Sequence, residues 1–337
     1  MSQSSYKIND LGLSKSRSQS SITAVNDNSM VIGSKSSAGE PYWFLWTPSE
    51  EVKIKVIRAK SINNLGDIVG NGLESKPNGL PYNNVVVVAY IYKNHKLIKL
   101  PVLANTVLSD ACSINDCGDV AGIIQTSKPL QRRACVWSEG KLKLLKLTAG
   151  FLSSEATAIN NRGQVAGCRK RRHNSSVISE AILWQNNEEI PLGPFAENRE
   201  SIATGINDSG QIIGCSFDTG EHLEKIDKHE FVWTDGHIKN LPGLARGKGS
   251  FSTANSINNQ GQIVGNSWVR ENHLHACLWQ QESVVDLNDL IPKNSGWTLI
   301  SAQSINDQGQ IACNGIYQGH IHAVLLMPQL STDSHGY

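Results

Sequence analysis

The chain has 337 residues, of which 39% are hydrophobic and 18% are charged, and its formal net charge is +1. This composition is typical of a folded protein and excludes an intrinsically disordered chain. A net charge so close to zero excludes a global attraction to nucleic acid or to membrane surfaces, so any electrostatic recognition must come from local patches.

The amino terminus and the cysteines predict the compartment. Residues 1–6 lack the positive segment and apolar run of a secretion signal, and no stretch approaches the roughly 20 apolar residues that cross a bilayer. Seven cysteines occur without a CxxC pair, which favours free buried thiols over disulfides or metal ligands. We therefore expect no membrane span and a protein that is cytoplasmic, or delivered into a host cell without a cleaved signal peptide.

A repeated motif, [Ile/Val]-Asn-[Asn/Asp]-x-Gly-[Gln/Asp]-[Ile/Val]-x-Gly, organises the whole chain. Its first asparagine recurs every 37 to 52 residues, at Asn26, Asn63, Asn115, Asn160, Asn207, Asn258 and Asn306. Units of this size match the four short strands of a propeller blade, and no segment has a long helical period. The sequence predicts an all-β fold, a seven-bladed β-propeller of four-stranded antiparallel blades that forms one domain over residues 1–337.

Each repeat has a predicted strand order. The first strand carries small residues two apart, as in Ala111-Cys112-Ser113, which suits a crowded inner strand. The Asn-[Asn/Asp]-x-Gly turn leads to a short second strand, because Asn closes turns with its side chain and Gly adopts positive φ. An apolar third strand ends on an aromatic residue, as in Phe231-Val232-Trp233, and a fourth strand such as Val284–Leu287 follows.

The last repeat lacks a fourth strand, and the amino terminus offers a replacement. Ile8-Asn9-Asp10-Leu11 has the same pattern as Val284-Val285-Asp286-Leu287. We expect residues 6–12 to pair with the third strand of the last blade, which closes the ring and leaves no unpaired edge. Residues 329–337 are expected to form a disordered tail.

The repeat resembles the HAF-repeat family of bacterial proteins, often described as probable extracellular repeats. The triplet of that family is approximated by His275-Ala276-Cys277, His322-Ala323-Val324 and His229-Glu230-Phe231, and its closing motif by Asp10-Leu11-Gly12. The resemblance extends from about Tyr6 to Pro328. It implies a β-propeller-like repeat fold and an extracellular location as the alternative to a cytoplasmic one, and it implies no activity. The chain departs from the repeat at Ser29 and Cys313, where glycines are expected.

A binding face is expected where the repeats differ. The motif turns are nearly constant in length, whereas the loops between second and third strands and the links between blades vary widely. Variable loops on a rigid scaffold usually carry recognition. This face also carries basic residues, which predict a partner-binding sector for an acidic ligand, either an acidic protein segment, a phosphate-bearing lipid or RNA: Arg132, Arg133, Arg169, Lys170, Arg171, Arg172, Arg246 and Lys248.

Metal and catalytic sites have weaker signals. His273 with His275 and His320 with His322 have workable spacing for a metal, but neighbouring blades diverge at the third strand and no further ligand completes four. The Asn or Asp at the second motif position is expected to form turns rather than to bind calcium. No catalytic motif is present, so we predict no catalytic residue and no cofactor.

The sequence favours a non-enzymatic interaction scaffold, a monomer that binds a protein or other macromolecule through its variable-loop face. The family resemblance and the missing export signal make a bacterial effector one form of this hypothesis. Two alternatives stay open. One is a hydrolase or lyase with its site at the axial mouth of the propeller, and the other is a carbohydrate-binding propeller that uses Trp43, Trp268 and Trp297.

Overall fold

The protein is all-β in the computed structural model, apart from one 3-10 turn, η1 (Leu287–Asp289). The described residues are 5–12, 19–36, 41–54, 58–75, 85–174, 176–193, 199–218, 228–245, 251–270, 273–281 and 283–329. The predicted tail therefore falls outside them after Gln329. Two compact units share the chain: unit 1 is Met1–Glu50 with Pro242–Tyr337, and unit 2 is Glu51–Leu241.

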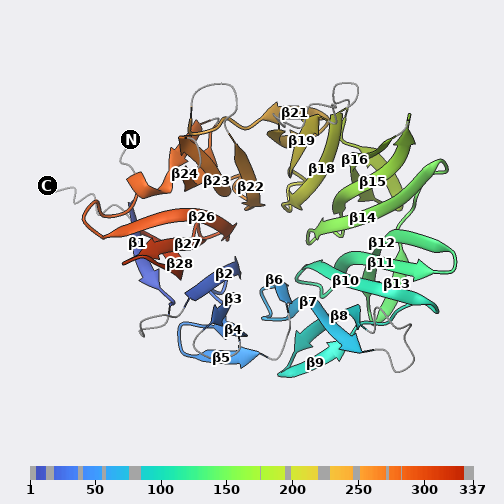
Figure 1. The fold of residues 1–337 in the computed structure, drawn as a ribbon, viewed down its shortest axis with the longest axis horizontal. Helices are drawn as coiled ribbons and strands as arrows, with labels where there is room; N and C mark the ends of the chain where they lie inside the picture. The colour runs from blue at the N-terminus through green and yellow to red at the C-terminus, as the bar shows by residue number, and fades with distance from the viewer. Residues whose placement is uncertain are drawn as a thin grey trace, which may run out of the picture. The chain divides into compact units, whose positions relative to one another are not determined.

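The strands are 4 to 10 residues long, and Figure 1 labels most of them. Unit 1 contains β1 (Ser5–Asp10), β2 (Gln19–Val25), β3 (Val31–Ser36), β4 (Tyr42–Trp46), β22 (Ser252–Ile257), β23 (Ile263–Arg270), β24 (His273–Gln280), β25 (Ser283–Asp286), β26 (Trp297–Ile305), β27 (Ile311–Tyr317) and β28 (His320–Gln329). Unit 2 contains β5 (Glu51–Ile54), β6 (Arg58–Ile62), β7 (Ile68–Ser75), β8 (Val85–Lys93), β9 (Lys96–Lys99), β10 (Thr106–Ile114), β11 (Val120–Ser127), β12 (Leu130–Ser138), β13 (Lys141–Leu144), β14 (Phe151–Ile159), β15 (Val165–His173), β16 (Ser176–Gln185), β17 (Glu188–Pro191), β18 (Arg199–Ile206), β19 (Ile212–Asp218), β20 (Lys228–Thr234) and β21 (His237–Asn240).

Each repeat forms a four-stranded antiparallel meander. The sheets run β2-β3-β4-β5, β14-β15-β16-β17, β18-β19-β20-β21 and β22-β23-β24-β25, and the last repeat forms β1-β28-β27-β26. Strands β6–β9 and β10–β13 form two further meanders, which a single parallel bridge between Leu108 and Val87 joins into one sheet.

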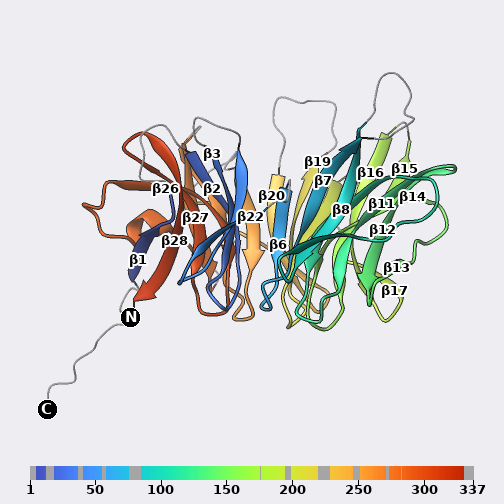
Figure 2. The same cartoon turned by 90° about the horizontal axis from the view of Figure 1, so that it is seen from below.

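Every meander has two distinct ends. We call the end with the Asn-motif turns and the third-to-fourth-strand turns the turn end. The opposite end, with the second-to-third-strand loops and the links between sheets, is the loop end. In Figure 2 the short turns of the unit 2 sheets lie at the lower edge of the picture. The motif turns all have the same length, whereas the connections at the loop end differ in length from sheet to sheet.

The first strand of each sheet contains a β-bulge beside the motif turn. In β10 the extra residue is Cys112, between Ala111 and Ser113, and in β22 it is Asn255. The small residues two apart therefore flank a bulge and do not follow a regular two-residue period. The bulged side chain reaches the next sheet: the Asn255 Nδ2 donates to the Ala302 carbonyl at 2.8 Å, and the Thr157 Oγ1 to the Ala203 carbonyl at 2.8 Å. The bulge therefore supplies contacts between sheets.

The motif asparagine closes its own turn and binds the next repeat. The Oδ1 of Asn160 accepts from the backbone N–H groups of Arg162 at 3.1 Å and Gln164 at 2.9 Å. Its Nδ2 donates to the Asn207 carbonyl at 2.9 Å. The same donation to the following repeat is made by Asn63, Asn115, Asn258 and Asn306. The buried amide thus uses its oxygen to close the turn and its nitrogen to bind the next repeat. These two roles together explain the repeated Asn better than turn formation alone.

The residues at the second motif position are hydrogen-bonded from one repeat to the next, and we call this series of residues the turn belt. In unit 2, each of Asp116, Asn161 and Asp208 accepts, through its Oδ1, the backbone N–H of the equivalent residue one repeat earlier, at 2.8 Å. The Asn161 Nδ2 also donates to Asp116 Oδ2 at 3.1 Å and to Asp208 Oδ2 at 3.0 Å. Unit 1 continues the pattern with Asn259, Asp307 and Asp27. Asn and Asp both carry the accepting oxygen, and their alternation places an amide donor beside each carboxylate in unit 2.

Buried aromatic residues join successive sheets. The indole Nε1 groups of Trp137, Trp184 and Trp279 donate to the carbonyls of Pro101, Lys146 and Pro242, at 2.7 to 2.8 Å. Each acceptor lies in the link that follows the preceding repeat, so the third-strand aromatic packs between neighbouring sheets and its polar atom finds a partner there.

The amino-terminal strand completes the last sheet of unit 1. Strand β1 pairs antiparallel with β28 from Ser5↔Gln329 to Asp10↔Val324, and Figure 1 shows the two strands side by side. Tyr6 and Leu11 are buried in unit 1, and their N–H groups donate to the carbonyls of Leu290 and Ala323 at 2.9 Å. The strand ends two residues earlier than the predicted 6–12.

Replacement of Ser29 by glycine is expected to stabilise the protein. Ser29 has φ 59°, and glycines occupy the equivalent turn position elsewhere, as at Gly163. A left-handed conformation costs a non-glycine residue about 1 kcal/mol, so Ser29→Gly should raise the free energy of unfolding by up to that amount, measured by urea denaturation. Ser209→Gly, at a position without positive φ, is the matched control and should be neutral or destabilising. Equal effects from the two variants would contradict the prediction.

Candidate functional site

The predicted basic residues of unit 2 lie on two neighbouring sheets. Arg132 and Arg133 lie on β12, and the run from Arg169 to Arg172 lies on β15, which reaches the loop end at His173. Arg246 and Lys248 lie outside the described residues. Because alternate residues of a strand face opposite sides, the basic run of β15 divides into two sets with different partners.

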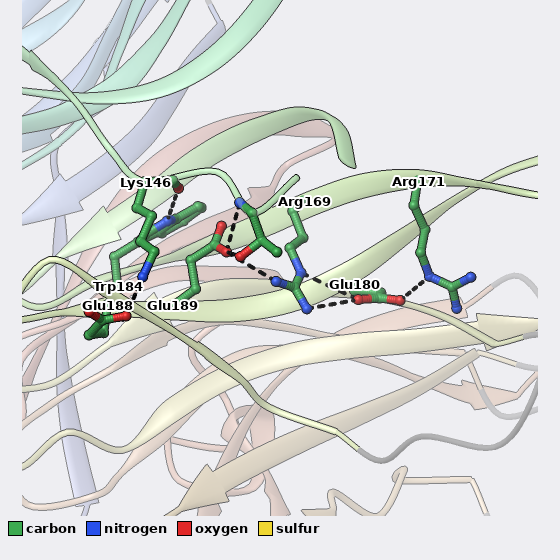
Figure 3. A network of polar contacts seen from close by, with 8 residues as sticks. Lys146, Arg169, Arg171, Glu180, Trp184, Glu188 and Glu189 are labelled. Atoms are coloured by element: carbon green, nitrogen blue, oxygen red, sulfur yellow. Dashed lines mark hydrogen bonds and ion pairs between the residues drawn. The ribbon is translucent and has the colours of Figure 1, made fainter. Parts of the chain in front are cut away.

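One set forms a network with two glutamates, shown in Figure 3. The Arg169 guanidinium donates to Glu180 Oε2 at 3.3 Å and to Glu189 Oε2 at 3.1 Å, and it lies 3.8 Å from the centre of the Phe151 ring. Arg171 donates to the other oxygen of Glu180. The Glu189 side chain is 3% exposed and also accepts from the Thr148 backbone N–H at 3.0 Å. This network fixes β15, β16 and β17 together, with Arg169 at its centre.

In the second set, Lys170 meets a glutamate from an inner strand. The Glu155 Oε1 lies 2.8 Å from Lys170 Nζ and 2.9 Å from Arg132 Nε, so one carboxylate is shared by two cations from adjacent sheets. Nearby, Lys60 donates to Asp110 at 2.7 Å and Asn71 donates to the same carboxylate at 2.7 Å. These half-buried pairs connect successive inner strands of unit 2.

Arg133 differs from its neighbours because it is held against backbone. Its Nη2 donates to the Leu145 carbonyl at 2.7 Å, in the link that leads to β14. Burial lowers the pKa of the Arg133 guanidinium, while the Glu189 carboxylate opposes that shift. The Arg133 side chain therefore contributes to packing between two sheets.

Two basic residues of this region remain exposed. Lys128 and Arg172 lie at the loop end and make no ion pair with another described residue. Arg132, Lys170 and Arg171 are paired yet keep about a third of their side-chain surface in solvent. Glu155 and Glu180 are each shared by two cations, so an excess of positive charge stays at this part of the surface.

Large exposed hydrophobic side chains gather at the loop ends. Among the described residues, this group comprises Leu73, Val85, Val102, Leu103, Leu130, Leu152 and Val177 in unit 2 and Phe251, Leu274 and Ile316 in unit 1. The remaining exposed large hydrophobic residues, Leu65, Leu97, Ile98 and Ile190, lie in a motif turn or on outer strands. In both units, therefore, most of the exposed large hydrophobic side chains of the described residues lie at the loop ends of the sheets.

In each predicted histidine pair, the second histidine is hydrogen-bonded to an aspartate. His275 Nδ1 lies 2.6 Å from Asp286 Oδ2, and His322 Nδ1 lies 3.1 Å from Asp10 Oδ1. Each histidine lies on a third strand, and each aspartate belongs to the outermost strand of the same sheet. The histidine of the His-Ala-x triplet and the aspartate of the closing Asp-Leu motif therefore meet as a His–Asp pair. Within the described residues, no group of three His, Cys, Asp or Glu side chains is placed to hold a metal ion, and His273 and His320 join no such group.

The aromatic residues considered for carbohydrate binding are half-buried. Trp297 stacks on Tyr317 with ring centres 4.8 Å apart, and Trp268 contacts Phe251 at 5.5 Å. Both pairs lie at the loop end of unit 1, and Trp43 lies on β4. Contact with a second ring occupies part of the face that a sugar would need.

The thiols are free, and most are inaccessible. Burial raises the pKa of Cys112 and Cys215 to about 11 and that of Cys168 to about 12, and it also raises the pKa of Cys135, Cys277 and Cys313. A neutral thiol with little exposure is a poor nucleophile, so these thiols are expected to react slowly.

Cys117 is expected to be the fast-reacting thiol, because it is exposed in a motif turn. In a titration with a chromogenic disulfide at pH 7.5, we expect one rapid equivalent that Cys117→Ser removes, while the other thiols react at least about 10-fold more slowly until denaturant is added. Rapid labelling that survives Cys117→Ser would contradict this assignment.

Some site residues were missed by sequence reasoning. The carboxylates of Glu180 and Glu189 could be expected from hairpin register, because Arg169 pairs directly with Glu180 across β15 and β16. The position of Leu130, Leu152 and Val177 at the loop end could also be expected, because each lies at or next to the first residue of its strand. Glu155 comes from another strand and has no such local signal.

The comparisons agree with the observed architecture. No helix among the described residues is long and apolar enough to cross a membrane. The β-propeller domain of the trilobed protease from Pyrococcus furiosus, reported to have an open velcro topology, is similar in fold with a TM-score of 0.62 and 7% identity, over 95% of this chain and all of that one. This likeness supports a β-propeller fold alone.

Two other solved structures are more distant. TolB from Acinetobacter baumannii is 10% identical, with a TM-score of 0.43 over 88% of this chain and 78% of its own. The sialidase of Trypanosoma rangeli, in complex with 2,3-difluorosialic acid, is 8% identical, with a TM-score of 0.43 over 96% of this chain and 59% of its own. No match was found among curated proteins. Residues 149–336 match the family described as "Protein of unknown function (DUF3466)", and the chain belongs to that family.

Proposed function

We propose that the protein is a non-enzymatic interaction scaffold that binds a macromolecular partner through the loop ends of its sheets. The observation that carries this proposal is the concentration of exposed large hydrophobic side chains at the loop ends, as at Leu73, Leu130 and Leu274. Isolated exposed leucines are ordinary, but their gathering at one end of successive sheets is typical of a binding surface.

The proposal includes a seven-bladed propeller closed by β1 and a repeat of the HAF type. The pairing of β1 with β28 and the asparagine donations between successive repeats support it. A rigid scaffold suits this function because recognition then depends on loops that vary independently of the core.

Site-specific photo-cross-linking tests the proposal. A benzophenone amino acid at Leu73, Leu130 or Leu274 should give discrete cross-linked products in an extract of cells that express the protein. The matched controls are the same substitution at Leu65 in a motif turn and at Leu97 on the outer strand β9, which are also exposed. Equal products from the controls, or none from any loop-end position, would overturn the proposal.

A further inference from the structure

We propose that the loop end of the two sheets β10–β13 and β14–β17 binds an acidic protein segment that carries aliphatic side chains. This inference rests on the proposed scaffold function and names the chemistry of one partner. The surface, which we call the cationic-aliphatic surface, consists of Lys128, Leu130, Leu152, Arg172 and Val177. All five residues belong to unit 2 and are exposed.

Register places these residues at the same end of neighbouring sheets. Val177 pairs directly with Arg172, and Leu130 pairs with Ser127 next to Lys128. The Ala134 N–H donates to Ser154 Oγ at 3.1 Å, which aligns β12 with β14. Both strands begin at the loop end, and Leu130 and Leu152 precede Ala134 and Ser154 in them. Both leucines therefore lie nearer the loop end than that contact does.

The aliphatic members favour a protein partner. Leu130 is 75% exposed, Val177 48% and Leu152 47%, so each has side-chain surface that a partner could bury. Burial of such side chains against a partner removes apolar surface from water and stabilises the complex. A single-stranded nucleic acid would need aromatic platforms, yet the face of Phe151, the aromatic residue beside Leu152, is covered by the Arg169 guanidinium.

The charge of the surface favours an acidic partner. Glu155 is shared by Arg132 and Lys170, and Glu180 is shared by Arg169 and Arg171, so neither carboxylate offsets Lys128 or Arg172. A segment with Asp or Glu beside Leu or Val therefore complements both the charge and the apolar character of the surface.

Peptide binding measured by fluorescence anisotropy tests the inference. The probes are three labelled 16-residue peptides: one alternates Glu pairs with Leu, the second replaces Glu by Lys, and the third replaces Leu by Ser. We expect the Glu/Leu peptide to bind at least about 10-fold more tightly than either of the others, and less tightly as salt is raised.

Two variants with matched controls locate the binding. Lys128→Glu with Arg172→Glu should weaken binding of the Glu/Leu peptide at least about 10-fold, whereas Lys141→Glu with Lys143→Glu, the same charge change on the outer strand β13, should weaken it less than about 2-fold. Leu130→Ser with Val177→Ser should weaken it several-fold at unchanged salt dependence, and Leu97→Ser on β9 should not.

Four outcomes overturn the inference. They are no binding of the Glu/Leu peptide, equal binding of the Glu/Ser peptide, equal losses from the β13 control, or tighter binding of a 12-nucleotide single-stranded RNA that depends on Lys128 and Arg172. If peptide binding fails while Leu73 or Leu274 still forms cross-links, the scaffold function stands and only this partner assignment fails. If no loop-end position cross-links, the scaffold function itself fails.

Discussion

Deletion of residues 1–12 is expected to lower the free energy of unfolding of unit 1 by at least about 4 kcal/mol. The deletion exposes one edge of β28 over six paired residues and removes the buried side chains of Tyr6 and Leu11. Each buried side chain contributes about 2 kcal/mol, and the exposed edge leaves backbone groups without protein partners. Denaturation followed by tryptophan fluorescence measures the loss.

Two point variants keep this prediction testable if the deleted protein does not fold. Tyr6→Ala should cost about 3 kcal/mol, whereas Lys7→Ala, on the exposed face of the same strand, should change stability by less than about 0.5 kcal/mol. Addition of a synthetic peptide of residues 1–12 should restore part of the lost stability in proportion to its concentration. An unchanged midpoint for the deletion, or equal costs for the two point variants, would show that β1 does not stabilise the sheet.

Asn160→Ala is expected to cost about 3 to 5 kcal/mol in unit 2. The side chain is 4% exposed, and its loss leaves the N–H groups of Arg162 and Gln164 and the carbonyl of Asn207 without that partner. An unsatisfied buried polar group costs about 1 to 3 kcal/mol. Urea denaturation, with hydrogen exchange of the Gln164 amide as a local probe, measures the effect.

Asn240→Ala is the matched control because Asn240 is exposed on the outer strand β21, and it should cost less than about 0.5 kcal/mol. Asn160→Asp separates the two functions of the amide. It retains the accepting oxygen but loses the donor to Asn207, and it buries a charge, so its cost should be comparable to that of Asn160→Ala and should decrease at acidic pH. A cost below 1 kcal/mol for Asn160→Ala would contradict the role assigned to the motif.

The repeat made much of the fold predictable. The spacing of the motif asparagines indicates four-stranded units, and the similarity of residues 8–11 to 284–287 places the first strand against the last sheet. Glycines of the motif turns have positive φ, as at Gly163. These features are local, and local backbone chemistry is visible in a sequence.

Contacts between repeats were less predictable. The pattern Ala111-Cys112-Ser113 suggests a regular inner strand, yet a bulge at Cys112 produces it. The partner of Asn160 lies 47 residues away, and the basic run at Arg169 meets carboxylates from three other strands. A single sequence shows the composition of such a run but not how much of its charge is neutralised by residues distant in the chain.

The turn belt restricts how the chain can gain or lose repeats. An Asn amide beside an Asp carboxylate recurs along Asn64, Asp116, Asn161 and Asp208 in unit 2. In unit 1, Asp307 instead lies next to a second aspartate, Asp27, whose Oδ1 accepts its N–H. Insertion of one repeat into the alternating series would place two amides or two carboxylates next to each other, and insertion of two would not. Duplication of repeats in pairs is therefore the less costly route by which such a chain lengthens, and a designer who extends it should copy two repeats at a time.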